Sequence, residues 1–492
     1  MASATKNPKP KVLKSIHLKV INMKQSIIFL LLGITLFPMG CTMAPKYTRP
    51  TAPVPAAWPV GAAYVETTST TNTGVVADLD WQAFFTDEKL RHVIAVSLTN
   101  NLDLRAAALN VELARAIYGI QRASLLPTFS LGASESKAGV PADLSSSGNR
   151  MTTTRYDANL GIAAWEIDFF GRIRSLKDRA LHEYLATEQA RRSAQILLIS
   201  AVAETYLALA ADRESLQLAE TTLKSQMDAY ALIKHRYDRG MVTELDLYRA
   251  QTQVDTARGD VAAFKQRVAQ DENALNLLAG SSVPAEMLPA QLTEVKQPQD
   301  IQAGISSDVL LRRPDVAQSE DMLKAANADI GAARAAFFPR ISLTTAIGTA
   351  SSELSGLFKG GSGAWMYAPQ IVMPIFDART WSALKAAKAQ QKIAVNQYEK
   401  SIQSAFREVA DALAVRGTVN EQVAAQESLV KAVTATHRLS TSRYDTGIDS
   451  YLSVLDAQRS LYGAQQRLVI LRYSKLANQV RLYAVLGGGC PK

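Results

Sequence analysis

The sequence predicts a mainly α-helical chain with a smaller β part, in which a unit of two strands and a long helical hairpin occurs twice. Three observations support this prediction. The stretch RYDRGMVTELDLYRAQTQV at 236–254 recurs as RYDTGIDSYLSVLDAQRSL at 443–461, which is 207 residues later, with seven of nineteen positions identical. Neither Gly nor Pro occurs from Arg172 to Arg239. Short segments that alternate apolar and small polar residues precede the long uninterrupted run in each half.

The spacing between the halves justifies the long helices. A continuous helix over 172–239 would span roughly 100 Å, so it must pack along other long helices. The intervals from Phe169 to Phe376 and from Val202 to Val409 are also 207 residues, which leaves no net insertion between these landmarks. Insertions rotate the apolar seam of a coiled coil away from its partner, so their absence indicates packed helices. The expected seam on the first long helix repeats every seven residues: Val202, Leu209, Leu216, Leu223, Tyr230 and Tyr237.

Two segments in each half are expected to be β-strands. After Pro127 the apolar period changes to two, with Phe129, Leu131 and Ala133 alternating with Ser or Gly. RASLLPTFSLGA at 122–133 returns as RAAFFPRISLTT at 334–345, and here the interval is 212 residues rather than 207. The difference of five falls within the strand–loop–strand stretch, because a surface loop tolerates insertions.

The expected organisation is two repeats separated by a polar linker that contains prolines. Thr243 is expected to cap the helix after the first turn, and the first helix is expected to break at Asn100-Asn101. The expected domains are an export signal at 1–40, an anchored Pro-rich arm at 41–80, a first repeat at 81–283, a linker at 284–304 and a second repeat at 305–488. The expected strands are about 128–138, 154–168, 340–350 and 365–376. The expected helices are about 86–124, 172–238, 244–279, 314–336, 379–445 and 449–486.

The first 40 residues have the layout of an export signal. From Met23 the sequence MKQSIIFLLLGITLFPMGC has a basic start, an apolar run and small residues before Cys41. The run is too short to cross a bilayer as a stable helix. Residues 1–22 are either part of this signal or an extension from a misplaced start codon. The Gly-Cys end resembles a bacterial lipobox that lipidates Cys41, whereas Pro38, in the place of the usual Leu, leaves an ordinary signal peptide as the alternative.

Composition argues against a nucleic-acid partner and against catalysis. The formal net charge of +9 falls to +3 without residues 1–40, which contain six lysines and no acidic residue. The sequence contains no HExxH, P-loop, GxSxG or Cys-x-x-Cys motif. The five histidines are scattered: His17, His92, His182, His235 and His437. We therefore expect no catalytic residue, no cofactor and no metal site.

Four strands per chain are too few to close a membrane barrel, since the smallest use about eight. An open sheet edge inside lipid would leave backbone N–H and C=O groups unsatisfied. The chain must therefore close its sheet with copies of itself, and the physics leaves two, three or four copies open. The alternative is a small soluble sheet at the end of a helical bundle. The export signal and the Pro-rich arm favour the membrane sheet.

The motifs together resemble the TolC-type outer-membrane efflux factors. These motifs are APKYTRPTAPVPAAW, WQAFFTDEKL, the two RYDxG turns, LDAQRSL and the LLP and FFP strand entries. The resemblance covers nearly all of 41–488 and is strongest to the NodT-like lipoproteins of resistance-nodulation-division efflux systems. It implies a homotrimer with a twelve-stranded β-barrel continued by a twelve-helix α-barrel. It also implies lipid attachment at Cys41 and an outer-membrane location extending into the periplasm.

The same resemblance implies partners and site residues. The partners are a periplasmic adaptor protein and an inner-membrane resistance-nodulation-division pump, with no cofactor. The residues implied at the two helix-turn-helix tips are Arg236, Tyr237, Asp238 and Gly240, and Arg443, Tyr444, Asp445 and Gly447. An acidic periplasmic gate matches Asp456, with Leu452 as an apolar constriction and Arg459 as a possible ion-pair partner. Arg249 occupies the position of Asp456 in the first repeat, so the two tips differ.

The implied function is an outer-membrane exit duct that passively conducts drugs, metals or other small solutes. A duct for type I protein secretion is the nearest alternative. A periplasmic adaptor lipoprotein is a third, although adaptors usually carry one hairpin between two halves of a lipoyl-like motif. This chain has two hairpins and no such motif. The resemblance places selectivity for the transported substrate largely in the pump rather than in the duct.

Overall fold

The computed structural model describes residues 42–64, 79–301 and 306–488. The expected export signal, Cys41 and Cys490 lie outside these ranges. The chain divides into two compact units. The sheet unit comprises residues up to Lys46, Ile120–Asp178 and Asn327–Lys388. The helical unit comprises Tyr47–Gly119, Arg179–Ala326 and the chain from Ala389 onward.

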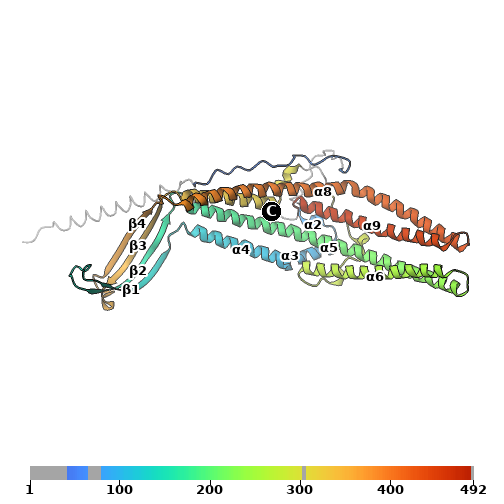
Figure 1. The fold of residues 1–492 in the computed structure, drawn as a ribbon, viewed down its shortest axis with the longest axis horizontal. Coiled ribbons are helices and arrows are strands. Elements are labelled where there is room, and N and C mark those ends of the chain that lie inside the picture. The colour runs from blue at the N-terminus through green and yellow to red at the C-terminus, as the bar shows by residue number, and fades with distance from the viewer. Residues whose placement is uncertain (1–41, 65–78, 302–305, 489–492) are drawn as a thin grey trace, which may run out of the picture. The chain divides into compact units, whose positions relative to one another are not determined.

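The element order follows the two repeats (Figure 1). The helices are α2 (Trp81–Phe84), α3 (Glu88–Asn100), α4 (Leu102–Ala123), α5 (Arg172–Asp238), α6 (Glu244–Ala279), α7 (Pro314–Ala335), α8 (Ala378–Asp445) and α9 (Tyr451–Val485). The strands are β1 (Phe129–Val140), β2 (Met151–Ile167), β3 (Arg340–Ser351) and β4 (Gly363–Val372). Short 3₁₀ helices lie at Ala285–Met287, Leu292–Glu294, Ser307–Arg312 and Leu354–Gly356.

The sheet unit contains one antiparallel sheet in the order β1-β2-β3-β4. The β2–β3 backbones approach closely at two glycines. A Cβ atom on Gly161 would lie 2.2 Å from the carbonyl oxygen of Thr345, and one on Gly348 would lie 2.0 Å from that of Ala158. Only glycine fits at these positions. A register shift between Ile162 and Trp165 marks a β-bulge in β2.

The strand bounds differ from the expectation at the loop ends. β1 and β2 extend toward each other, as far as Val140 and Met151, because backbone pairing continues through residues whose side chains no longer alternate. β4 ends at Val372 rather than near 376, just before Pro374, which has no N–H to donate. Pro369 lies inside β4, and an edge strand tolerates such a residue.

The helical unit is organised around a core of aromatic and aliphatic side chains. The ring of Phe84 stacks on that of Tyr483 with centroids 4.0 Å apart. The Tyr483 hydroxyl donates to the carbonyl of Leu79 at 2.6 Å. The expected helix over 86–124 is divided at Asn101, whose side chain accepts from Leu104 N and donates to the carbonyl of Leu278. The helix is thus interrupted at Asn101, which caps the start of α4 and also holds the end of α6.

The apolar seam of α5 differs from the expected one. Val202 and Leu209 are buried, but Leu216, Leu223 and Tyr230 are only partly buried and Tyr237 is exposed. The buried positions of α5 beyond Leu209 are Ala210, Ala211, Ser215, Ala219, Gln226 and Ile233. A helix of 3.6 residues per turn drifts about 20° per heptad against a seven-residue repeat, so a straight helix presents a new set of residues after two heptads.

The expected polar linker at 284–304 is a packed segment. Leu292, Val295 and Ile301 are buried in the main core. Arg416 on α8 holds the end of this segment, with its guanidinium 3.1 Å from the Asp300 carboxylate and hydrogen-bonded to the carbonyl of Ile301. The prolines and polar residues led to the linker interpretation, but its apolar residues anchor it to the helices.

Candidate functional site at the hairpin tips

The two sequence repeats form the turns of two helical hairpins, α5–α6 and α8–α9. Gly240 has φ +71° and Gly447 has φ +76°, the left-handed region that glycine adopts without strain. A Cβ atom would meet nothing within 4 Å at either position, so the backbone angle and not space requires glycine here. This explains why each RYDxG stretch retains its Gly.

The residues before each glycine complete the same helix C-cap. In the first turn Gly240 N donates to the Tyr237 carbonyl at 2.7 Å, and Met241 N donates to the Arg236 carbonyl at 2.9 Å. In the second turn Gly447 N donates to Tyr444 at 3.0 Å, and Ile448 N donates to Arg443 at 2.9 Å. This double hydrogen bond satisfies carbonyls at a helix end that otherwise lack partners.

The chain leaves the two turns in different ways. Thr243 caps α6. Its hydroxyl accepts a hydrogen bond from Asp246 N, and the Asp246 carboxylate accepts one from Thr243 N, both at 3.3 Å. Ser450 precedes α9 without a side-chain cap. Instead the Arg443 guanidinium lies 2.6 Å from the Asp449 carboxylate, and this hydrogen bond lowers the pKa of Asp449. The second turn therefore depends on an ion pair where the first uses a capping box.

One polar contact joins the two tips within the chain. The Arg236 guanidinium donates to the Tyr444 hydroxyl at 2.7 Å, and its central carbon lies 5.2 Å from the centroid of the same ring. The Tyr444 ring in turn lies 5.3 Å from the Tyr451 ring. Arg236 and Tyr444 occupy different places in the repeat, so the contact is asymmetric.

A small apolar cluster, called here the tip cluster, lies behind this contact. Its buried members are Ile233, Ala250, Tyr451, Val454 and Leu455. The Tyr451 hydroxyl is buried and has no hydrogen-bond partner among the described residues. Burial, followed by the nearby Tyr444, raises the pKa of Tyr451 to about 12, so the phenol stays neutral.

The expected gate residues lie on α9 just beyond the tip cluster. The Asp456 side chain is 63% exposed and its carboxylate lies 3.7 Å from the Arg459 guanidinium. Arg459 also donates to Gln253 on α6 at 3.3 Å, which connects the two hairpins a second time. Leu452 is 40% exposed. Leu452, Asp456 and Arg459 follow a spacing that places them on one face of α9.

The side chains of the remaining expected tip residues make local contacts or are exposed. The Asp238 carboxylate lies 3.1 Å from the Lys234 ammonium, one helical turn earlier. Tyr237 and Asp445 are exposed. Arg249, the counterpart of Asp456, lies 3.8 Å from Asp246 on its own helix. The structure thus brings Arg236, Tyr444 and Arg459 into contacts between the hairpins and leaves the others on the surface.

Sequence reasoning missed Asp449, Gln253 and Tyr451. All three stabilise the tips, but the first repeat has Val242 and Glu244 where the second has Asp449 and Tyr451. A search for repeated positions therefore passes over them. The spacing of Arg443 and Asp449 across the second turn, with the intervening Gly447, is the one signal that could have identified that ion pair.

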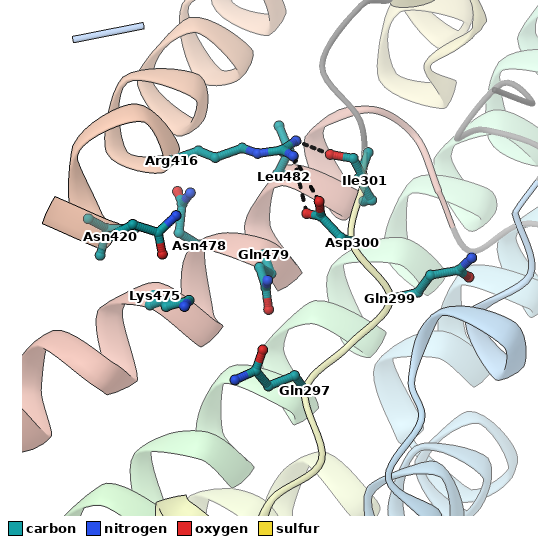
Figure 2. Close-up of a pocket in the computed structure, with 11 residues that line it drawn as sticks. Gln297, Gln299, Asp300, Ile301, Arg416, Asn420, Lys475, Asn478, Gln479 and Leu482 are labelled. Atoms are coloured by element: carbon teal, nitrogen blue, oxygen red, sulfur yellow. Dashed lines mark hydrogen bonds and ion pairs between the residues drawn. The ribbon is translucent and has the colours of Figure 1, made fainter. Parts of the chain in front are cut away.

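A separate polar pocket of about 250 Å³ lies between α8, α9 and the segment before Ile301 (Figure 2). Amide side chains and one ammonium group dominate its lining: Gln297, Gln299, Asn420, Lys475, Asn478 and Gln479. Arg416 at its edge is engaged with Asp300. The lining lacks a nucleophile beside a general base, so it has no arrangement for catalysis. Among the described residues, no three or more His, Cys, Asp or Glu side chains gather as they would to hold a metal ion.

The sequence matches the family described as "Outer membrane efflux protein" over residues 93–281 and 305–488. It is 46% identical over 460 residues to the toluene efflux pump outer membrane protein TtgC of Pseudomonas putida, covering 93% of this chain and 95% of that protein. Identity and coverage are the same for the antibiotic efflux pump outer membrane protein ArpC of Pseudomonas putida. The open-state crystal structure of the Neisseria gonorrhoeae MtrE outer membrane channel matches with a TM-score of 0.80 at 36% identity, covering 91% of this chain and 98% of that chain.

These matches extend over both repeats and confirm the resemblance to TolC-type efflux factors. They favour an efflux duct over a secretion duct or an adaptor. The chain therefore belongs to the outer membrane efflux protein family, and it is an outer-membrane exit duct of an efflux pump rather than an enzyme.

Proposed function

We propose that three copies of this chain form one continuous duct, with a twelve-stranded barrel in the outer membrane and a twelve-helix tube below it. The observation that carries the proposal is the four-stranded sheet with two open edges. The outer sides of β1 and β4 pair with no strand among the described residues. In lipid these backbone groups need partners, and the β1 edge of one copy can pair with the β4 edge of the next.

Exposed apolar side chains support this assembly. Leu131 is 82% exposed and Trp365 is 80% exposed in the single chain. Such residues suit the lipid-facing surface of a membrane sheet. On α4, which has no buried residue, Leu109, Leu113 and Ile117 form an exposed apolar stripe that suits a neighbouring helix.

The lipid anchor at Cys41 belongs to the same proposal. The residues just after it are fixed against the end of α7 within the sheet unit. Asn327 donates to the carbonyl of Pro45 at 2.7 Å, and Arg334 donates to that of Met43 at 3.1 Å. A Cβ atom on Gly331 would lie 2.7 Å from Ala44 N. This attachment supports an acyl chain held beside the membrane-inserted sheet.

The first test is mass measurement on the full mature protein extracted in detergent. Native mass spectrometry should give three chains per particle, and the denatured mass should exceed that of a chain beginning at Cys41 by the acyl groups. A Cys41→Ser variant should lose the added mass and keep three chains. A stable single chain in water without detergent would rule the duct out.

We further propose that the hairpin tips engage a periplasmic adaptor and, through it, an inner-membrane resistance-nodulation-division pump. The solutes are proposed to be apolar solvents and antibiotics, by analogy with relatives named for toluene and antibiotic efflux. Deleting the gene should lower the tolerated concentration of toluene and of amphiphilic antibiotics severalfold. Unchanged tolerance to both, with a loss of tolerance to metal salts, would contradict this substrate class.

Asp456 and Leu452 are proposed to close the periplasmic end. In a trimer, three Asp456 carboxylates around one axis would repel one another and favour cations. Replacing both Asp456 and Leu452 with Ala should raise the resting current through single ducts in a planar bilayer severalfold and weaken cation selectivity. The matched control is Asp445→Ala, an exposed Asp at the other end of the same turn. Wild-type conductance in the double variant would remove the gate assignment.

The Arg236–Tyr444 contact is proposed to hold the two tips in the closed arrangement. Tyr444→Phe removes the hydroxyl that accepts from Arg236 and keeps the ring. A hydrogen bond to a charged group contributes about 1.5–3 kcal/mol, so its loss should increase the open population about tenfold or more. The measurement is open probability in planar bilayers. Tyr237→Phe, at an exposed tyrosine of the other tip, should behave as wild type; if both variants open equally, the contact is not the latch.

A further inference from the structure

Two carboxyl groups meet between α5 and α6 in the helical unit, well away from the tips. Asp212 on α5 and Asp271 on α6 lie within hydrogen-bonding reach of each other, and both are partly buried. An ion pair between the residues that follow the two aspartates fixes the register of α5 against α6. The Arg213 guanidinium lies 2.6 Å from the Glu272 carboxylate and also donates to the carbonyl of Pro289. The two aspartates are therefore held side by side by the adjacent ion pair.

The pair contains an acceptor atom that is not satisfied. Oδ2 of Asp271 is buried and has no partner among the described residues. Ionised carboxylates only accept hydrogen bonds, so two of them in contact satisfy neither. A protonated carboxylic acid gains one O–H donor, which can reach the other carboxylate. The two carboxyl groups can therefore share one proton, and losing that proton costs free energy.

The surrounding charges do not replace that proton. Arg267 on α6 is the cation whose field reaches both aspartates, but it is exposed and its guanidinium lies 5.2 Å over the Phe264 ring. Tyr473 on α9 feels the charge of the pair: burial, followed by Glu204 on α5 and then by Asp271 and Asp212, raises its pKa so that it stays neutral. Burial, followed by the charge of Asp212, raises the pKa of Asp271 to about 6.

We propose that Asp212 and Asp271 form a proton-binding site that fastens α5 to α6. With one proton between them, the two carboxyl groups make a charge-assisted hydrogen bond across the helix pair. Without it, two like charges in a partly buried position repel and loosen the packing. The hairpin is tighter in an acidic medium and more easily opened in a neutral one. This site acts within one chain and stands apart from the proposed gate.

The sign of the pH dependence follows from the raised pKa of Asp271. Opening the helix pair returns Asp271 to water, where its pKa is near 3.9. A group with a raised folded-state pKa stabilises fully at low pH, and that stabilisation is lost as pH rises through about 6. Between about pH 5 and about pH 7.5 the opening equilibrium should increase roughly tenfold, since each pH unit above the solvated pKa and below the folded one contributes a factor of ten.

The test is hydrogen exchange on the full protein in detergent or nanodiscs, followed on peptides covering 205–215 and 268–275. After correction for the intrinsic exchange rate, wild-type protection in both peptides should fall about tenfold from about pH 5 to about pH 7.5. In Asp271→Asn the amide donates to Asp212 at every pH, so protection should be independent of pH and should exceed wild type at the higher pH. Asp255→Asn, at an exposed aspartate of α6 paired with Arg258, is the matched control and should retain the wild-type profile.

Asp212→Asn tests the site from the other helix and covers the case in which Asp271→Asn does not fold. It removes the like charge and should also flatten the profile. A wild-type pH profile in either folded variant, or wild-type protection that does not change with pH, would overturn the proposal. A merely structural role predicts an equal loss of protection at both pH values.

Discussion

Backbone hydrogen bonding at the outer edges of β1 and β4 is the constraint on which the rest of the structure depends. Each of these strands pairs along one side, so each presents a row of N–H and C=O groups that no other strand of the described residues satisfies. Such groups cost several kcal/mol each in hydrocarbon, which no packing of a single four-stranded sheet can offset. In the proposed assembly, copies of the chain would remove the edges, and their symmetry would then apply to the helices. Since one chain supplies two hairpins, a closed ring alternates two kinds of tip.

Because two kinds of tip would alternate, the repeats can have the same backbone conformation at the turn and different side chains after it. Gly240 and Gly447 end their helices with the same pair of hydrogen bonds, because reversing a long helix poses the same geometric problem twice. Beyond the turns the chemistry differs, with the Thr243 capping box on one side and the Arg443–Asp449 ion pair on the other. The contact of Arg236 with Tyr444 joins the unlike tips through an Arg and a Tyr that both repeats contain, so it depends on how the two hairpins are placed and not on divergence of the repeats.

The long helices could be predicted from the sequence because their signals are redundant. The run without Gly or Pro and the constant interval of 207 residues both indicate α5, and the structure has a helix over that range. The buried face of α5 beyond Leu209 could not be predicted, because it depends on how far the helix drifts from a seven-residue repeat. The site was only partly predictable. The glycines follow from turn geometry, whereas Asp449 and Gln253 act through contacts that have no counterpart in the other repeat.

Apolar contacts hold the middle of the helical unit together, whereas mostly polar contacts hold the hairpin tips. In the middle of the helical unit Val202, Leu209 and Tyr483 are buried within one large cluster, and moving them apart would expose apolar surface at about 25 cal/mol per Å². The tip cluster has only five buried residues, and the contacts around it are hydrogen bonds and ion pairs of partly buried or exposed groups. Water replaces an exposed ion pair at a net cost of about 1 kcal/mol or less, and the Arg236–Tyr444 hydrogen bond at a net cost of about 1.5–3 kcal/mol. The hairpin tips can therefore separate while the middle keeps its packing, and the free-energy difference between their arrangements is small enough for a bound partner to supply.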